Sequence, residues 1–164
     1  MKGWKIKSVE GMPAGETFCE LVDLNLSIFP PSSKADPEKS REDRARGLRE
    51  HLEGRRHILT LLAYEGGQLV AFKLGFMERK YYFESWQGGV VAQMRRRGIS
   101  SELMERQHAW CAAKGFRIIT TITDSENVPM TILNLRHGFR IVGTFFDRGQ
   151  NLKLTLQKRL DVAS

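Results

Sequence analysis

Residues 90–100 read VVAQMRRRGIS and connect a predicted strand to a predicted helix. The first turn of a helix carries N–H groups without partners inside the helix, and it lies at the positive end of the helix dipole. A glycine there, Gly98 in this chain, lets a phosphate approach the backbone, while Arg95, Arg96 and Arg97 add positive charge. The stretch therefore predicts an anion-binding turn, with an ordinary turn and solvated arginines as the alternative.

The helix after this turn starts without a Ser-x-x-Glu capping box. Its amides are therefore available to a ligand, unless Ser100 or Ser101 caps them locally. The stretch also lacks the Gly-Lys-Ser/Thr sequence of a P-loop and the G-x-G-x-x-G sequence of a dinucleotide-binding fold. ATP and NAD are therefore disfavoured as ligands.

The apolar pattern around the turn predicts a mixed α/β (α+β) domain built on one sheet. Gly88 and Gly89 interrupt one predicted strand, which indicates a bulge or the close approach of another backbone. No repeat or linker divides the chain, so residues 1–164 are expected to form a single domain. Strands are expected over residues 4–9, 58–64, 69–77, 82–91, 116–123, 140–146 and 152–158, and helices over 16–28, 37–52, 99–113 and 128–137.

The composition narrows the class of protein. The net charge is +7, and a basic chain attracts nucleic acid, anionic membranes and anionic small molecules alike. Residues 34–57 hold eight Lys/Arg and six Asp/Glu, which predicts a solvated helix of mixed charge. Cys19 and Cys111 are too few and too far apart for a disulfide framework or a metal site, so both are expected to be free thiols.

Apolar runs in the chain are short. None approaches the roughly 18–20 residues that span a bilayer, and residues 1–15 contain no stretch of signal-peptide length. We therefore expect a cytoplasmic protein that does not bind membranes.

Two motifs together resemble the GNAT superfamily of N-acetyltransferases. Residues 95–100, RRRGIS, are similar to its acyl-CoA motif Q/R-x-x-G-x-G/A, with Ser100 as the final small residue. Residues 127–139, NVPMTILNLRHGF, resemble its second motif N-x-x-A-x-x-L-Y-x-x-x-G-F. One predicted helix and one predicted strand separate the two, as in that superfamily. The resemblance is close over residues 57–158 and rests on element order in the N-terminal third.

The resemblance implies a fold and a cosubstrate. It implies a central twisted mixed sheet whose fourth and fifth strands splay apart, flanked by about four helices. Acetyl-CoA would then lie with its pantetheine arm between those strands and its pyrophosphate on the amides of the turn. The resemblance implies no metal. The residues that it assigns to acetyl-CoA are Gly88, Gly89, Val90, Arg96, Arg97, Gly98, Ile99, Ser100, Ser101, Asn127 and Asn134.

Acetyl transfer to an amine requires a neutral amine, a donor for the developing oxyanion and, usefully, a proton for the leaving thiolate. Glu84 is the candidate base: it lies eleven positions before Arg95, on the strand where histone acetyltransferases of the superfamily carry theirs. A strand-face glutamate paired with an arginine is the alternative. The superfamily's usual acid is a tyrosine in the second motif, but this chain has Asn134 there. An amide can only hydrogen-bond the sulfur or the pantetheine.

Three other residues have structural interpretations. His108 shares a helix face with Met104 and Cys111, which indicates packing rather than catalysis. Trp86 and Trp110 are assigned to the core.

Three functions follow as hypotheses. The first is transfer of the acetyl group of acetyl-CoA to a primary amine, on a small molecule or a protein, by direct attack in a ternary complex. The acceptor pocket would be built by residues 29–34, the second helix and residues 78–82 and 147–151. The second is a CoA-binding regulatory or structural module without turnover. The third, nucleic-acid binding, rests on charge alone and lacks aromatic residues among the basic ones. The oligomeric state stays open, a homodimer included.

Overall fold

The computed structural model describes residues 3–161, and its elements follow the predicted order. The sequence-predicted bounds agree with the observed ones to within two residues at both ends of every predicted element. The elements are β1 (Trp4–Glu10), α1 (Gly15–Ile28), α2 (Pro37–Leu52), β2 (Arg56–Glu65), β3 (Gln68–Arg79), β4 (Tyr82–Val90), the 3-10 helix η1 (Ala92–Met94), α3 (Ile99–Ala113), β5 (Ile118–Asp124), α4 (Val128–Arg136), β6 (Arg140–Phe146) and β7 (Leu152–Arg159).

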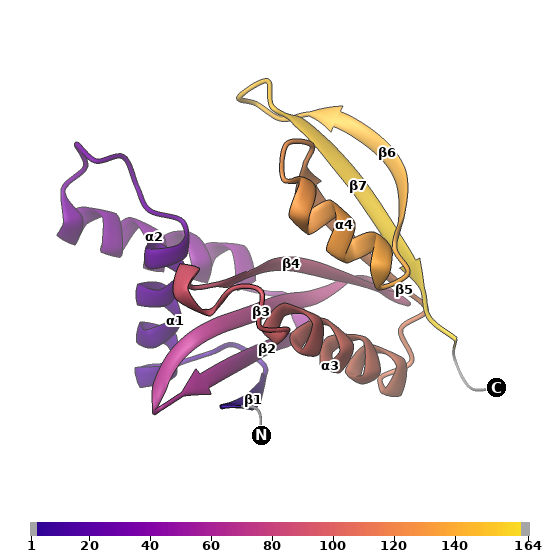
Figure 1. The fold of residues 1–164 in the computed structure, drawn as a ribbon, viewed down its shortest axis with the longest axis horizontal. Helices are drawn as coiled ribbons and strands as arrows, with labels where there is room; N and C mark the ends of the chain where they lie inside the picture. The colour runs from indigo at the N-terminus through magenta and orange to yellow at the C-terminus, as the bar shows by residue number, and fades with distance from the viewer. Residues whose placement is uncertain (1–2, 162–164) are drawn as a thin grey trace.

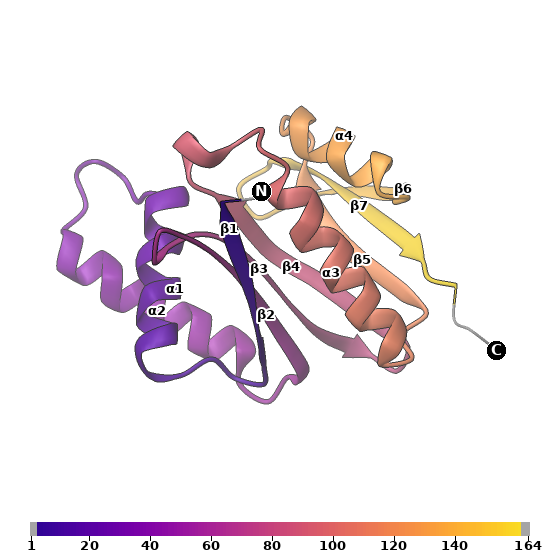
Figure 2. The same cartoon turned by 60° about the horizontal axis from the view of Figure 1, so that its bottom comes forward.

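All seven strands form one sheet in the order β1-β2-β3-β4-β5-β7-β6 (Figure 1). Neighbours run antiparallel except β4 and β5, which run parallel. Two helices, α1 and α2, cover one face of the first four strands, while α3 and α4 lie on the other face (Figure 2). The mixed α/β sheet with four helices confirms the predicted fold class.

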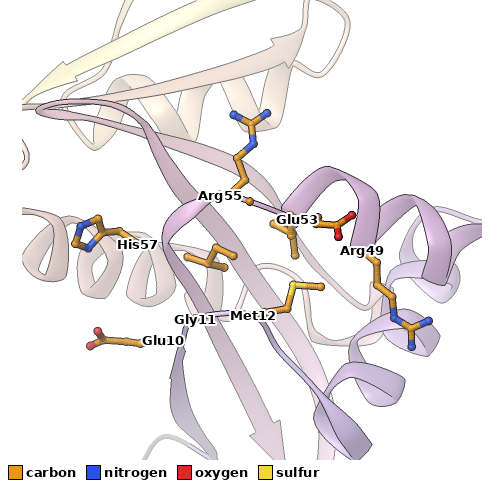
Figure 3. Close-up of a pocket in the computed structure, with 10 residues that line it drawn as sticks. Glu10, Gly11, Met12, Arg49, Glu53, Arg55 and His57 are labelled. Carbon is orange, nitrogen blue, oxygen red and sulfur yellow. The ribbon is translucent and has the colours of Figure 1, made fainter.

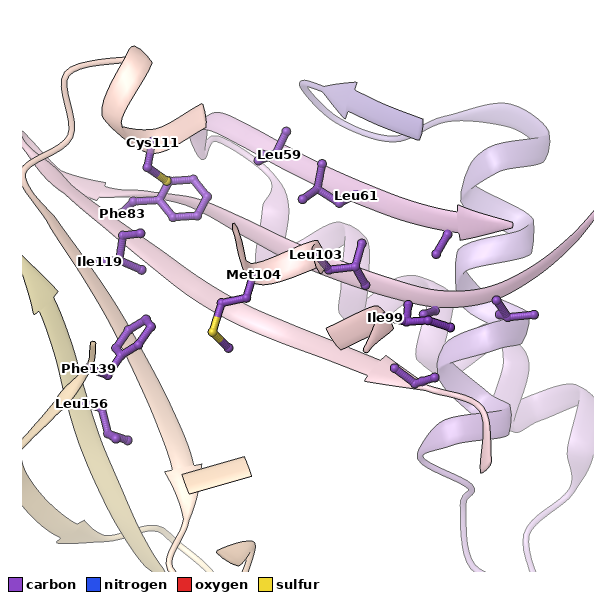
Figure 4. Close-up of a cluster of buried hydrophobic side chains, with 14 of the residues drawn as sticks. Leu59, Leu61, Phe83, Ile99, Leu103, Met104, Cys111, Ile119, Phe139 and Leu156 are labelled. Carbon is purple, nitrogen blue, oxygen red and sulfur yellow. The ribbon is translucent and has the colours of Figure 1, made fainter. Parts of the chain in front are cut away.

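Side-chain alternation on the inner strands supplies two cores. On β3, Phe72, Leu74 and Phe76 pack with α1 and α2, whereas Ala71 packs with α3. Successive residues of a strand point to opposite faces, so one strand serves both layers. Figure 4 shows the α3 side, which joins the two halves of the sheet. Its labelled members are Leu59, Leu61, Phe83, Ile99, Leu103, Met104, Cys111, Ile119, Phe139 and Leu156.

The polar helix α2 is stabilised by a cap at its N-terminus and by one stripe of apolar residues. Asp36 caps it, because its carboxylate accepts a hydrogen bond from the amide of Lys39 at 2.8 Å. Leu48 and Leu52 are buried, as the apolar stripe in the sequence predicted. The mixed-charge prediction for this segment is therefore confirmed. None of the helices among residues 3–161 combines the length and apolar character needed to cross a bilayer.

The C-terminal end of the sheet exposes apolar side chains. All seven residues of β6 are exposed, and eight of the twelve exposed large apolar residues in the described part of the chain lie between 128 and 152. These eight are Val128, Ile132, Leu135, Ile141, Val142, Phe145, Phe146 and Leu152. The homodimer that the sequence left open stays a prediction.

Candidate functional site

A gap opens between β4 and β5. The two strands pair only from Tyr82 with Ile118 to Glu84 with Thr120. Beyond that point β4 continues to Val90 and β5 to Asp124 without further pairing. Parallel strands that start together and then separate leave the facing backbone groups unpaired. The splayed fourth and fifth strands implied by the resemblance are therefore present.

A β-bulge marks the start of the gap. Leu74 of β3 pairs with Gln87, but the next residue, Gly75, pairs with Ser85, so Trp86 is the extra residue of β4. The sequence predicted a bulge or the close approach of another backbone at Gly88 and Gly89. The bulge lies two residues before Gly88, and the close approach is found at Gly88 itself, where a Cβ would lie 3.1 Å from the carbonyl oxygen of Phe72 on β3. A Cβ on Gly89 would lie 2.8 Å from Ile28 Cγ2 of α1. That glycine is needed for helix packing, not for a bulge.

Register and alternation assign each side chain to a face. Cross-strand partners share a face, and Phe76, the partner of Glu84, packs with α1 and α2. Glu84 therefore lies on the α1/α2 face. Gly88 pairs with Lys73 on the opposite face, under α3.

Buried polar groups gather around the gap on the α3 and α4 side. Gln107 is fully buried, and neither atom of its amide has a partner among residues 3–161; the same is true of His108 Nε2. Buried polar atoms are ordinarily hydrogen-bonded, so these orphans fit a site built for a polar ligand. The buried polar side chains on these strands and helices are Ser85, Gln107, His108, Thr121, Thr123 and Asn134.

The basic turn at the open end of the gap has the predicted character. Gly98 is the N-cap of α3 with φ +87°, and no side chain caps the helix. Within the described chain, the backbone amides of residues 96–101 have no hydrogen-bond acceptor. Such a row of free amides at a helix N-terminus binds anions. Ser101 does not cap locally; its hydroxyl lies 3.2 Å from His137 Nε2.

The three arginines of the turn differ in availability. Arg97 forms an ion pair with Glu65, Nη2 to Oε1 at 2.8 Å, so its guanidinium braces β2. The Arg95 side chain donates to the carbonyl of Val90 at 3.1 Å. Arg96 has φ +62° and an exposed side chain without an ion pair in the described residues. Of the three, Arg96 is the guanidinium that can reach a phosphate.

Glu84 occupies the closed end of the gap, in the last residue pair before the strands separate. Burial raises the pKa of its carboxyl above the ordinary value, Glu78 raises it further, and Arg55 lowers it. Arg55 lies over the Phe76 ring at 4.5 Å on the same face. A half-buried carboxylate with a raised pKa is suited to accept a proton. Its catalytic role stays a prediction.

The two asparagines of the second motif both make structural bonds. Asn127 is the N-cap of α4, and its side-chain oxygen accepts from the amide of Met130 at 3.3 Å. Asn134 is buried, and its amide donates to Thr123 on β5 at 3.3 Å. Asn134 thus lies beside the gap, at the position that the family's tyrosine would occupy. Contacts of either residue with pantetheine stay predictions.

On the α1/α2 face a cavity of about 490 Å³ opens between α2 and β4. His51 stacks on Trp86 along its wall, with 3.8 Å between ring centroids. Trp86 therefore lines a cavity as well as packing on the core, which corrects its assignment to the core alone. Of the segments expected to form the acceptor pocket, residues 29–34 and α2 contribute, whereas residues 78–82 and 147–151 do not.

A second cavity of about 540 Å³ lies where β1 ends and α2 meets β2. Figure 3 shows that the guanidinium groups of Arg49 and Arg55 point in opposite directions. His57 and Glu10 lie across the cavity from Arg49. It contains none of the residues expected to bind the coenzyme or to catalyse transfer. We do not assign the site to it.

Three polar residues of the site were missed by sequence reasoning. Lys73 lies among apolar residues of β3, Gln107 lies between Arg106 and His108 on α3, and His51 lies beside Leu52 on α2. The signal available in the sequence was Lys73 itself, a charged residue in the middle of an internal strand with an apolar residue on either side.

Comparison with known proteins agrees with this geometry. The model of the acetyltransferase (GNAT) family matches residues 19–139. The curated proteins contain no match.

Solved structures share the fold at low identity. The ribosomal-protein-S18-alanine N-acetyltransferase from Escherichia coli has a TM-score of 0.74 and 11% identity, covering 96% of this chain and 97% of its own. An acetyltransferase structure from Acinetobacter baylyi has a TM-score of 0.72 and 21% identity, covering 98% and 96%. An aminoglycoside 6'-acetyltransferase type Ii has a TM-score of 0.72 and 17% identity, covering 93% and 96%. The family model spans most of the chain, and the chain therefore belongs to the acetyltransferase (GNAT) family.

Proposed function

We propose that this acyltransferase moves the acetyl group of acetyl-CoA to a primary amine by direct attack in a ternary complex. The observation that carries the proposal is the gap between β4 and β5. It ends at Glu84 and opens toward the uncapped basic turn at Gly98. A carboxylate at one end and free amides at the other match the two ends of an acetyl thioester attached to a pyrophosphate.

The chain's own groups fit such a substrate. The free amides from Arg96 to Ser101 would bind the pyrophosphate, and the exposed Arg96 side chain would add charge. The backbone of Gly88, Gly89 and Val90, which has no strand partner on the β5 side, would hydrogen-bond the pantetheine; the Val90 carbonyl already accepts from Arg95. An amide near Val90 would polarise the thioester carbonyl.

Glu84 would act as the base from the α1/α2 face, directly or through a water. The incoming ammonium must lose a proton before it can attack, and a carboxylate with a raised pKa accepts that proton more readily. The acceptor would approach past Trp86, whose cavity lies on the same face. The acceptor class stays open: the structural relatives act on a ribosomal protein in one case and on an aminoglycoside in another.

Glu84→Gln tests the proposal. Thiol release from acetyl-CoA and product mass are measured across polyamines, amino acids, aminoglycosides and peptides with free N-termini or lysines. We expect one acceptor class to be acetylated, and turnover to fall about 10²- to 10⁴-fold in Glu84→Gln, with acetyl-CoA affinity unchanged. Glu16→Gln, at an exposed glutamate in the first turn of α1, is the matched control and should keep most activity.

The second candidate is a CoA-binding module without turnover, favoured by Asn134 in place of a tyrosine. Acetyl-CoA binding with no acetylated product in either wild type or Glu84→Gln would support it. Binding to nucleic acid with steep salt dependence would instead revive the charge-based alternative.

A further inference from the structure

Lys73 is a charged residue in the interior of the sheet. It lies in the middle of β3, which has a strand on each side, and it faces α3. The residue as a whole keeps partial exposure. Burial lowers the pKa of its ammonium to about 8. The neighbouring strand β4 offers no side chain opposite Lys73.

The missing side chain is that of Gly88, the register partner of Lys73. A Cβ on Gly88 would lie 3.5 Å from Lys73 Cγ, in ordinary van der Waals contact, so the lysine stem lies beside that glycine. At Gly88 the strand β4 pairs with β3 on one side and has no partner on the β5 side, where it borders the gap. The charge of Lys73 acts on Cys111 and His108 of α3 and on His137 after α4. These groups lie on the helices that flank the gap.

No ion pair or hydrogen bond engages the Lys73 ammonium among residues 3–161. The other lysine nearby is engaged: Lys158 Nζ donates to His108 Nδ1 at 3.0 Å. Burial and nearby charge lower the pKa of His108 to about 3, so the ring is neutral and accepts that bond. The remaining charged group that acts there is Glu105, which influences His137. Lys73 is therefore the free proton donor on this side of the gap.

Direct transfer leaves a thiolate that needs a proton, and Asn134 cannot supply one because an amide does not ionise at neutral pH. A donor works best when its pKa is close to that of the group it protonates. The pKa of an ordinary thiol is about 8.5, close to the value for Lys73. The fold therefore holds a matched acid next to the strand that carries the base.

We propose that Lys73 is the acid of the reaction and protonates the departing coenzyme thiolate, an inference that rests on the proposed acetyl transfer. The amine nitrogen forms a bond to the acetyl carbon, the carbon–sulfur bond breaks, and its electron pair stays on sulfur. Glu84 takes the proton lost by the amine, and the sulfur takes one from Lys73 Nζ. The neutral lysine regains its proton from water in the gap after the products leave. Acid and base act from opposite faces of the sheet.

The test titrates the thiol of bound CoA, which needs no acceptor and no turnover. The ultraviolet absorbance of the thiolate is followed against pH in complexes with wild type, Lys73→Met and Lys158→Met, with Lys7→Met on exposed β1 as the control. A neighbouring ammonium lowers a thiol pKa by about one to three units. We expect this lowering in wild type, Lys158→Met and Lys7→Met, and its loss in Lys73→Met. The isosteric methionine should preserve the fold, which is checked by acetyl-CoA affinity.

Turnover adds a second measurement. The activity of wild type should fall as the pH rises through the pKa of Lys73, and Lys73→Met should be slower without this alkaline decline. Equal thiol titrations in wild type and Lys73→Met would overturn the proposal, as would a shift produced by Lys158→Met instead. If no acceptor is ever acetylated, the proposed function fails while the thiol titration still decides the placement of Lys73.

Discussion

At the residue scale, Lys73 combines an internal strand position with a charge that lacks a carboxylate partner. Enclosing an ammonium removes it from water, and that loss is compensated only when ion pairs or hydrogen bonds replace the water. Here the folded chain retains the unfavourable group on β3, one strand away from the gap between β4 and β5. Functional sites are where proteins keep such destabilising arrangements.

Lys73→Met should therefore stabilise the free protein at neutral pH. The pKa of Lys73 is about 8 in the folded chain, against an ordinary value of 10.5. The unfolded chain therefore holds the proton more tightly between these values, and wild-type stability rises with pH across that window. The loss of stability caused by Lys73 is complete below pH 8, where it is at most about 3 kcal/mol.

Denaturant unfolding of wild type and Lys73→Met from pH 6 to 10 measures this effect. The free energy gap between the two proteins should be largest below pH 8 and should narrow as the pH approaches 10.5. Other groups titrate in both proteins and cancel in the difference. A gap that widens with pH would contradict the burial of the ammonium.

At the element scale, α3 is bounded by two glycines with similar left-handed backbone conformations. Gly98 has φ +87° at its start and Gly115 has φ +82° just beyond its end, and a Cβ on either would have open space around it. Left-handed backbone costs about 1–2 kcal/mol for a residue with a Cβ. Gly98→Ala and Gly115→Ala should therefore lose similar stability.

Only Gly98→Ala should weaken the binding of acetyl-CoA, because Gly98 orients the free amides of the turn, whereas Gly115 lies at the other end of the helix. Calorimetric titration of both variants checks this, and CoA fragments without the pyrophosphate should show no difference between them. Equal affinity losses in the two variants would mean that α3 acts through its stability and not through the turn.

At the scale of the whole molecule, the gap leaves the two halves of the sheet joined by only three residue pairs between β4 and β5. One apolar cluster contains residues of α3 together with Leu59 and Leu61 on one half and Ile119 and Leu156 on the other, so α3 belongs to a core that spans both halves. A ligand that fills the gap should therefore stabilise the entire fold.

Acetyl-CoA at 100 times its dissociation constant should add about 2.7 kcal/mol to the free energy of unfolding. For a chain of this length the melting temperature should rise by about 5–10 °C. Thermal unfolding with increasing acetyl-CoA measures the shift, and Gly98→Ala should require more ligand for the same rise. A constant melting temperature at saturating acetyl-CoA would contradict a site in the gap.

Much of the fold could be predicted from the sequence, because its signals are local. The alternation in β3, the capped polar helix α2 and the glycine before α3 each depend on residues a few positions apart. The same locality explains why the turn at Gly98 was found. A glycine pair does not distinguish a bulge from a close approach, so the sequence left both open. The structure has the close approach at the glycines and the bulge at Trp86, and Ile28, which packs on Gly89, is far away in the chain.

The sequence by itself determined the order of the elements, the uncapped basic turn before α3 and the family, because these reside in periodicity and short motifs. Only the tertiary structure decided which faces meet. Strand register brings Lys73 alongside Gly88 and places Glu84 on the opposite face, while helix packing leaves His51 against Trp86. Register and helix packing are set by the sum of many distant contacts. No single stretch of the chain contains the information that places these residues relative to one another.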